Sequence, residues 1–230
     1  MCSPPAAFLL PPSPCGWPDR GSAGRLCGCG ADSRMGFGAR PAPPAGLRVP
    51  PSATERPHAV EFLDVIAGRR SVRHFNSKLS VSDDDVRALL EAAVSAPTAG
   101  NIQPWRFVVV RSLEARERLA SALHQKWATG APVTIVVCVD PRPCYARYND
   151  RGERLYALQD TAAAVENILL AAVDRGLAAC WVGAFDEDAV REALGVASPI
   201  TPIAIIPVGH SAEAAGRPAR RPLSEVTTWL

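Results

Sequence analysis

No stretch of this 230-residue chain approaches the roughly 20 consecutive apolar residues that a membrane-spanning helix needs. The best candidate, residues 168–182, is interrupted by Asp174 and Arg175. The formal net charge of +2 is spread along the chain and forms no basic block of the kind found in nucleic-acid-binding arms. The sequence therefore predicts neither a membrane span nor a nucleic acid partner.

Histidine is scarce, and the cysteines do not form a recognisable metal or disulfide pattern. His74, His124 and His210 have no carboxylate or cysteine at a catalytic or metal-ligand spacing. Cys27 and Cys29 lack a matching second pair, so an incidental origin competes with metal binding there. We expect no protein nucleophile, no metal site and no disulfide framework. This cysteine usage fits a reducing cytoplasm.

Residues 1–57 are rich in proline and glycine and show no helical or strand period. Such a composition cannot bury enough apolar surface to offset the ordering of the chain. We predict a disordered N-terminal extension over residues 1–57 and a folded domain over residues 58–230. A partner-binding role for the cysteine-rich extension is an alternative.

Residues 141–154 are polar and contain two prolines and a glycine, which is typical of a mobile surface loop. Elsewhere, Ser82 and Asp85 have the spacing of a helix capping box, while Asp186 and Gly195 mark the two ends of a later helix. Periodicity and such end signals predict helices over residues 59–68, 79–95, 113–123, 155–176 and 187–194, and strands over residues 106–110, 133–139, 177–182 and 203–208.

The stretch 95–105 joins a predicted helix to a predicted strand and combines two prolines with a glycine, so we expect a rigid loop. Its side chains Thr98, Asn101 and Gln103 can donate and accept hydrogen bonds without carrying charge. That chemistry suits the edge of a planar heterocycle. The competing interpretation is that these groups satisfy the backbone of their own loop.

Arginine is concentrated at two places. The run Arg69-Arg-Ser-Val-Arg73 directly follows a predicted helix end and can clamp a phosphate, although a solvated basic turn is the alternative. The C-terminal tail holds three further arginines and ends with Leu223, Val226 and Trp229. These apolar residues predict a tail that packs on its own body or on a partner subunit.

The order of several motifs resembles the nitroreductase family of FMN-dependent oxidoreductases over about residues 58–230. The motifs are Arg69-Arg-Ser-Val-Arg73, Ala96-Pro-Thr-Ala-Gly-Asn-Ile-Gln-Pro-Trp105, Leu177-Ala-Ala-Cys-Trp-Val-Gly183, Pro207-Val-Gly-His210 and Arg220-Arg-Pro-Leu-Ser-Glu225. The resemblance implies an α+β fold with a mostly antiparallel central sheet flanked by helices. It also implies an intertwined homodimer with FMN at the subunit interface.

Carried over by position, the resemblance implies that the FMN phosphate is held by Arg69, Ser71, Arg220, Arg221 and the backbone of Arg70. Arg73 would then approach the pyrimidine end of the flavin. The resemblance further implies three sets of flavin contacts, namely Pro97, Thr98 and Ala99 from the partner subunit, the amides of Asn101 and Gln103, and a backbone donor from the turn at Gly183 and Ala184.

The activity implied is ping-pong reduction of an electron-poor nitroaromatic, quinone or flavin by NAD(P)H, because a bound flavin carries the redox chemistry. Two alternatives stay open. One is an FMN storage or redox-sensing protein without turnover, and the other is a specialised dehalogenating or flavin-fragmenting member. The turn Trp181-Val-Gly-Ala184 also departs from the Pro-Ile-Glu-Gly of some relatives, so their glutamate contact to nicotinamide is missing.

Overall fold

The computed structural model describes residues 61–230, so the predicted extension of residues 1–57 lies outside it. The described chain contains a four-stranded sheet in the order β1-β2-β4-β3, and every pairing is antiparallel. Its strands are β1 (Trp105–Val110), β2 (Val133–Val139), β3 (Ala178–Ala179) and β4 (Thr201–Gly209). The α+β fold expected from the sequence is therefore confirmed.

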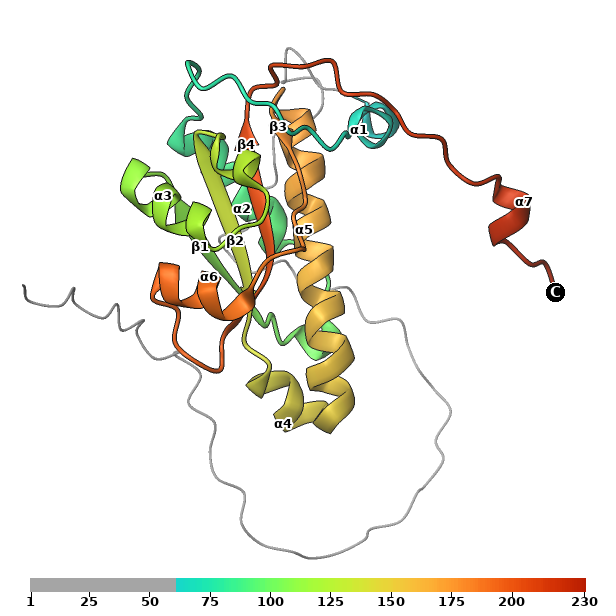
Figure 1. Cartoon of the computed structure of the whole chain (residues 1–230). Coiled ribbons are helices and arrows are strands. Elements are labelled where there is room, and N and C mark those ends of the chain that lie inside the picture. Colours follow the sequence, from blue (N-terminus) through green and yellow to red (C-terminus); the bar gives the residue numbers. More distant parts are fainter. Residues whose placement is uncertain (1–60) are drawn as a thin grey trace, which may run out of the picture. The chain divides into compact units, whose positions relative to one another are not determined.

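Helices cover both faces of the sheet (Figure 1). The helices α2 (Asp83–Val94) and α5 (Ala157–Asp174) pack on one face, while α3 (Leu113–Ser121) and α6 (Glu187–Leu194) pack on the other. Every residue of β2 is buried because alternate side chains enter the two cores. Strand β1 is an edge of the sheet.

The remaining described elements are short: α1 (Phe62–Gly68), the 3₁₀ turns Ala99–Asn101 and Lys126–Thr129, α4 (Arg142–Arg151), the π-helical turn Gly152–Tyr156 and α7 (Leu223–Val226). Within residues 61–230, no helix is both long enough and apolar enough to cross a membrane.

The local end signals act as the sequence predicts. The backbone N–H of Asp85 donates to Ser82 Oγ at 3.0 Å, and the Asp85 carboxylate accepts from the Ser82 backbone at 3.3 Å. At the start of α6, Asp186 accepts from the Ala189 backbone at 3.0 Å, and Gly195 ends that helix with φ of 65°. The left-handed backbone at Gly195 is one that glycine adopts without a Cβ penalty.

The prediction of a mobile loop over residues 141–154 is wrong, because this segment forms α4 and the π-helical turn that leads into α5. Only Cys144 and Gly152 are buried there, so the segment has too few inward-facing apolar residues to show a helical period. The contact that fixes the start of α4 comes from a residue outside the segment. Asp140, at the end of β2, accepts bonds from the backbone and the guanidinium of Arg142.

Two other expectations also need correction. The predicted strand 177–182 pairs regularly only over Ala178–Ala179, and Val182 forms an isolated bridge to Ile205. The ladder breaks opposite Pro207, which accepts from the Cys180 backbone at 3.4 Å but has no N–H to donate in return. The helical period read over residues 59–68 implies one buried face, but in α1 only Val65 is buried, while the side chains Phe62, Leu63 and Ile66 are exposed.

Replacing Asp140 with asparagine is expected to destabilise the fold by about 1–3 kcal/mol at pH 7, because the buried acceptor loses the negative charge that pairs with Arg142. The side chain of Asp140 is 5% exposed and binds Arg142 at 2.7 Å. Hydrogen bonds from the Arg142 side chain are the main reason that the pKa of Asp140 is lowered. The folded-state pKa is below the unfolded one, so this stability is present above about pH 4 and is lost as the pH falls through the folded value.

Urea unfolding of the wild type and of Asp140→Asn at pH 7 and at acid pH measures this difference. The exposed Asp150 on helix α4 provides the matched control, and Asp150→Asn should unfold like the wild type. A loss in Asp140→Asn that is equally large at both pH values would contradict the assigned charge effect.

Candidate functional site

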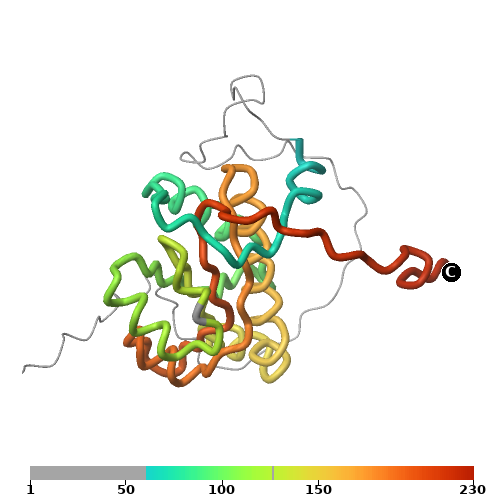
Figure 2. Tube along the Cα trace, turned by 45° about the horizontal axis from the view of Figure 1, so that its top comes forward, coloured from blue at the N-terminus to red at the C-terminus, as the bar shows by residue number. Residues whose placement is uncertain are grey.

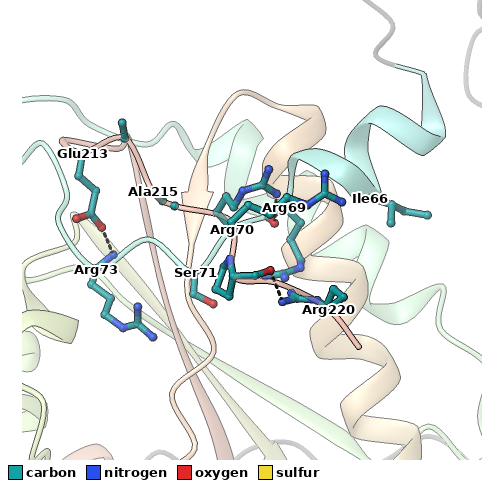
Figure 3. Close-up of a pocket in the computed structure, with 12 residues that line it drawn as sticks. Ile66, Arg69, Arg70, Ser71, Arg73, Glu213, Ala215 and Arg220 are labelled. Carbon is teal, nitrogen blue, oxygen red and sulfur yellow. Dashed lines mark hydrogen bonds between the residues drawn. The ribbon is translucent and has the colours of Figure 1, made fainter. Parts of the chain in front are cut away.

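The arginine run after α1 and the C-terminal tail together line a cavity of about 710 Å³ (Figure 3). Five arginines surround it, and Glu213 is its one acidic lining residue; the arginines are Arg69, Arg70, Arg73, Arg217 and Arg220. The hydroxyl-bearing Ser71 also belongs to the lining. An excess of guanidinium groups around a cavity attracts a multiply charged anion such as a phosphate.

The backbone of the arginine run is fixed against the sheet. Ser71 bridges Ala179 in a parallel arrangement, and the Val72 N–H donates to the Ala179 carbonyl at 3.2 Å. The Arg70 guanidinium turns back to the carbonyls of Ala67 and Arg69 at the end of α1. Arg70 therefore uses its side chain locally, which leaves its backbone as the part that can face a ligand.

Glu213 ties the tail to the arginine run. Its carboxylate accepts from the backbone N–H groups of Arg73 and His74 at 2.8 and 3.3 Å, and from His74 Nδ1 at 2.6 Å. The bond from the Arg73 backbone is the largest cause of the lowered pKa of Glu213. This attachment holds the start of the tail beside Arg73, and from there the chain continues to Arg217 and Arg220 along the cavity.

The adjacent tail residues Arg220 and Arg221 differ in position. Arg220 lines the cavity, whereas Arg221 does not and instead bonds to Glu225 within the tail. The family resemblance implies a phosphate contact for both. The geometry favours Arg220.

The turn at Gly183 and Ala184 follows the strand segment that pairs with Ser71. Cys180 lies close enough to Ser71 and Arg73 for both to affect its thiol pKa, although burial raises that pKa overall. Both Gly183 and Ala184 are exposed, and a Cβ at Gly183 would have Trp181 Nε1 as its nearest neighbour at 3.8 Å. The backbone of this turn is thus accessible to a ligand.

The loop before β1 is held in an uncommon conformation. Gly100, Asn101 and Gln103 have φ values of 58°, 58° and 56°, which residues with a Cβ adopt rarely. Thr98 Oγ1 accepts from the Gln103 backbone at 3.3 Å, and the Gln103 amide donates to Asn101 Oδ1 at 3.1 Å. In the single chain, these polar groups therefore bond to one another, as the competing interpretation of this loop expects.

Asp160 anchors this loop from α5, and sequence reasoning missed it. Both of its carboxylate oxygens face the Ala99 N–H, at 3.0 and 3.1 Å, and the residue is only 7% exposed. Burial raises its pKa, and the bond from Ala99 opposes that rise. Asp160 falls on the same face of the helix as Ala164 and Ile168, and this position is visible in the sequence. A charge on a buried helix face needs a specific partner, so the position could have indicated a structural contact.

The structure does not bring all the predicted site residues together. Gly68, beside the arginine cavity, packs at Val173, whereas the loop bonds to Asp160, thirteen residues earlier on α5. At 1.5 Å per residue, the two helix positions are about 20 Å apart. Figure 1 shows α1 and β3 near one end of α5 and α4 near the other. Within one chain, the lining of the arginine cavity thus includes none of the loop residues Pro97, Thr98, Ala99, Asn101 and Gln103.

Comparison with known proteins identifies the family. The sequence model described as "Nitroreductase family" matches residues 66–129 and 120–210. The chain belongs to the nitroreductase family. Among its relatives, the NADH dehydrogenase/NAD(P)H nitroreductase of Archaeoglobus fulgidus is 36% identical over 65% of this chain and 85% of its own length. The NADH dehydrogenase of Thermus thermophilus is 31% identical over 70% of this chain and 92% of its own length.

Solved structures of nitroreductases share the fold. A nitroreductase family protein of Clostridium difficile has a TM-score of 0.66 and 28% identity, and the match covers 74% of this chain and 98% of the other. A nitroreductase of Exiguobacterium sibiricum, solved in complex with FMN, has a TM-score of 0.70 and 22% identity over 75% of this chain and 98% of its own. The nitroreductase fold inferred from the sequence motifs is therefore confirmed.

Proposed function

We propose that this protein is an FMN-dependent oxidoreductase that uses NAD(P)H to reduce an electron-poor acceptor such as a nitroaromatic, a quinone or a flavin. The observation that carries this proposal is the five-arginine cavity, which has the charge and the donor groups that a flavin phosphate requires. The FMN complex of a nitroreductase with the same fold and the NAD(P)H named for relatives support the choice of cofactors.

In this proposal, Arg69, Ser71 and Arg220 hold the phosphate, together with the backbone of Arg70. Arg73 extends from a backbone fixed by Glu213, and its guanidinium carbon lies 5.8 Å from the Trp127 ring. In this proposal, that guanidinium faces the negative charge at the pyrimidine end of the flavin. The exposed turn at Gly183 and Ala184 offers backbone donors to the ring system. Bound FMN would supply the hydride-transfer chemistry, with NAD(P)H and the acceptor binding in turn, and the protein binds and orients the reactants.

We further propose that two copies form an intertwined homodimer in which the loop of Pro97, Thr98, Ala99, Asn101 and Gln103 completes the site of the partner. The separation of about 20 Å along α5 supports this arrangement. The tail supports it as well. In Figures 1 and 2, the chain beyond Glu213 leaves the sheet and carries α7 away from the other helices. Trp229 is 88% exposed and Leu223 is 72% exposed.

The folded part of the chain also exposes an apolar surface, on strand β1 and helix α2. Edge strand β1 and helix α2 line a second cavity that includes Leu90, Val94 and Val109, with 49% of Val94 exposed. Exposed apolar residues on the tail and in this second cavity favour association of two copies of the chain. Charged residues, among them Arg87 and Glu91, also line the second cavity.

An absorbance spectrum of the purified protein with FMN tests the function. The spectrum is recorded before and after anaerobic NADH or NADPH, and again after a quinone or a nitroaromatic is added. We expect the flavin absorbance to bleach with the nucleotide and to recover with the acceptor. Bound FMN that never bleaches would favour the storage or sensing alternative. Failure to bind FMN would overturn the proposal.

A further inference from the structure

The helical corner formed by α4 and the π-helical turn carries two tyrosines flanked by two arginines, beside the loop that bonds to Asp160. The Arg147 guanidinium carbon lies 5.4 Å from the Tyr148 ring, whose centroid is 5.2 Å from that of Tyr156 in an edge-to-face arrangement. The Arg151 guanidinium carbon lies 5.4 Å from the Tyr156 ring, and its Nε donates to the Tyr156 hydroxyl at 2.9 Å. We call Arg147, Tyr148, Tyr156 and Arg151 the Arg–Tyr row.

The row is directly attached to the proposed flavin loop. Arg147 Nη1 donates to the Gly100 carbonyl at 3.0 Å. A Cβ at Gly100 would come within 2.7 Å of both the Arg147 guanidinium and the Tyr148 hydroxyl. Glycine at this position thus permits the corner to approach the loop closely. Any molecule that stacks on a flavin at this loop also lies next to the row.

Most of the donor capacity of the two guanidinium groups is unused. Arg147 and Arg151 are exposed, and no carboxylate among residues 61–230 lies within ion-pair distance of either one. Asp150 and Glu153 are exposed on the same corner, and neither forms a bond to the row. By contrast, Arg142 on the same helix is held by both oxygens of Asp140. The row therefore presents two cations that no acid of the described chain neutralises.

The backbone of the corner is built at a conformational cost. Asn149 has φ of 52° and ψ of −147°, a region that residues other than glycine rarely occupy. Gly152 lies so close to the Cys144 carbonyl that a Cβ would clash with it. Strained residues and π-helical turns are both enriched at functional sites. They place Tyr148 and Tyr156 in contact although the two residues belong to different turns.

We propose that the Arg–Tyr row binds a planar aromatic group bearing an anionic substituent, on a molecule that exchanges electrons with the flavin. The tyrosine rings offer faces and edges to the aromatic group, and the guanidinium groups pair with a carboxylate or a phosphate. Two sources supply this chemistry: the 2′-phosphate and adenine of NADPH, or an aromatic acceptor that carries a carboxylate. The inference rests on the proposed function for the position of the flavin, but not on turnover.

Equilibrium binding to the full-length, FMN-loaded protein tests the proposal with two matched pairs of probes. The first pair is 2′,5′-ADP and 5′-AMP, which differ by the 2′-phosphate. The second pair is 4-nitrobenzoate and the neutral 4-nitrobenzamide. We expect the anionic member of at least one pair to bind about tenfold more tightly, as one charge-assisted hydrogen-bonded pair permits. A preference in the first pair assigns the row to NADPH, and one in the second pair assigns it to the acceptor.

Arg151→Gln is the decisive variant because Arg151 contacts Tyr156 and not the flavin loop. It is expected to abolish the preference while FMN content and circular dichroism stay unchanged. Arg147→Gln should have the same effect on the preference. Arg154→Gln removes an exposed arginine of the corner that is outside the row, and it should retain the preference.

Binding that discriminates in neither pair, or discrimination that survives in Arg151→Gln, would overturn the proposal. Because these are binding measurements, a protein that holds FMN without turning over still gives a reading. A negative result here is therefore distinct from failure of the proposed redox function. Failure of the protein to bind FMN at all would remove both proposals, since the row would then have no flavin beside it.

Discussion

Replacing Arg69 with glutamine is expected to weaken FMN binding by roughly ten- to a hundredfold, because hydrogen bonds to a charged phosphate contribute about 1.5–3 kcal/mol. Arg69 is half-buried in the cavity, and its one acidic neighbour in the described chain, Glu166, lies 4.0 Å away and is far more exposed. That ion pair is weak, so the guanidinium remains available to a ligand. Fluorescence titration of the protein with FMN measures the change.

The tail arginines provide a matched comparison for this experiment. Arg220→Gln should weaken FMN binding to a similar degree because Arg220 lines the cavity, whereas Arg221→Gln should have little effect because Arg221 bonds to Glu225. The two variants remove the same charge from neighbouring positions, so a long-range field alone would affect both. Equal affinities for the wild type, Arg69→Gln and Arg220→Gln would place the phosphate elsewhere.

Ending the chain after Pro222 is expected to convert the protein from a dimer into a monomer and to abolish FMN binding. The truncation retains the three tail arginines but removes Leu223, Val226 and Trp229, all of which are exposed in the single chain. Burying one tryptophan against a partner removes roughly 150–250 Å² from water. At about 25 cal/mol per Å², that is about 4–6 kcal/mol for each tail before the cost of ordering it is subtracted.

Light scattering coupled to size-exclusion chromatography measures the mass, and retained flavin absorbance measures the cofactor. Deletion of residues 1–57 is the control for a large change in chain length, and we expect this variant to stay dimeric and yellow. Loss of activity or of partner recovery in that control would instead support the partner-binding role of the extension. A truncated protein that remains a dimer, or a wild type that is a monomer, would contradict the proposed use of the tail.

The contacts of Asp160 and Glu213 illustrate how the site depends on residues that are far apart in the chain. Asp160 and Ala99 are 61 positions apart, and Glu213 bonds to the backbone of Arg73 across 140 positions. Neither carboxylate forms part of a local motif. Each fixes the backbone of a predicted ligand-binding segment, so a study that altered only the predicted residues would overlook the groups that hold them in place.

The sequence by itself determined the elements whose signals are local. The capping box of α2, the start and end of α6 and the apolar run of β2 each depend on side chains within a few positions of one another. The order of the motifs was also sufficient to indicate the nitroreductase family. Periodicity failed at residues 141–154, because that helix buries little more than Cys144 and its start is set by the contact of Arg142 with Asp140.

Only the tertiary structure decided how the predicted site is divided. The arginine run and the tail converge because β3 and Glu213 hold them together, while the loop of Thr98 and Asn101 is bound to Asp160 of α5. The structure alone also placed Arg147 and Tyr148 against Gly100. Sequence patterns report which face of a segment is apolar. They do not report which distant segment covers it, because that depends on packing contacts between residues far apart in the chain.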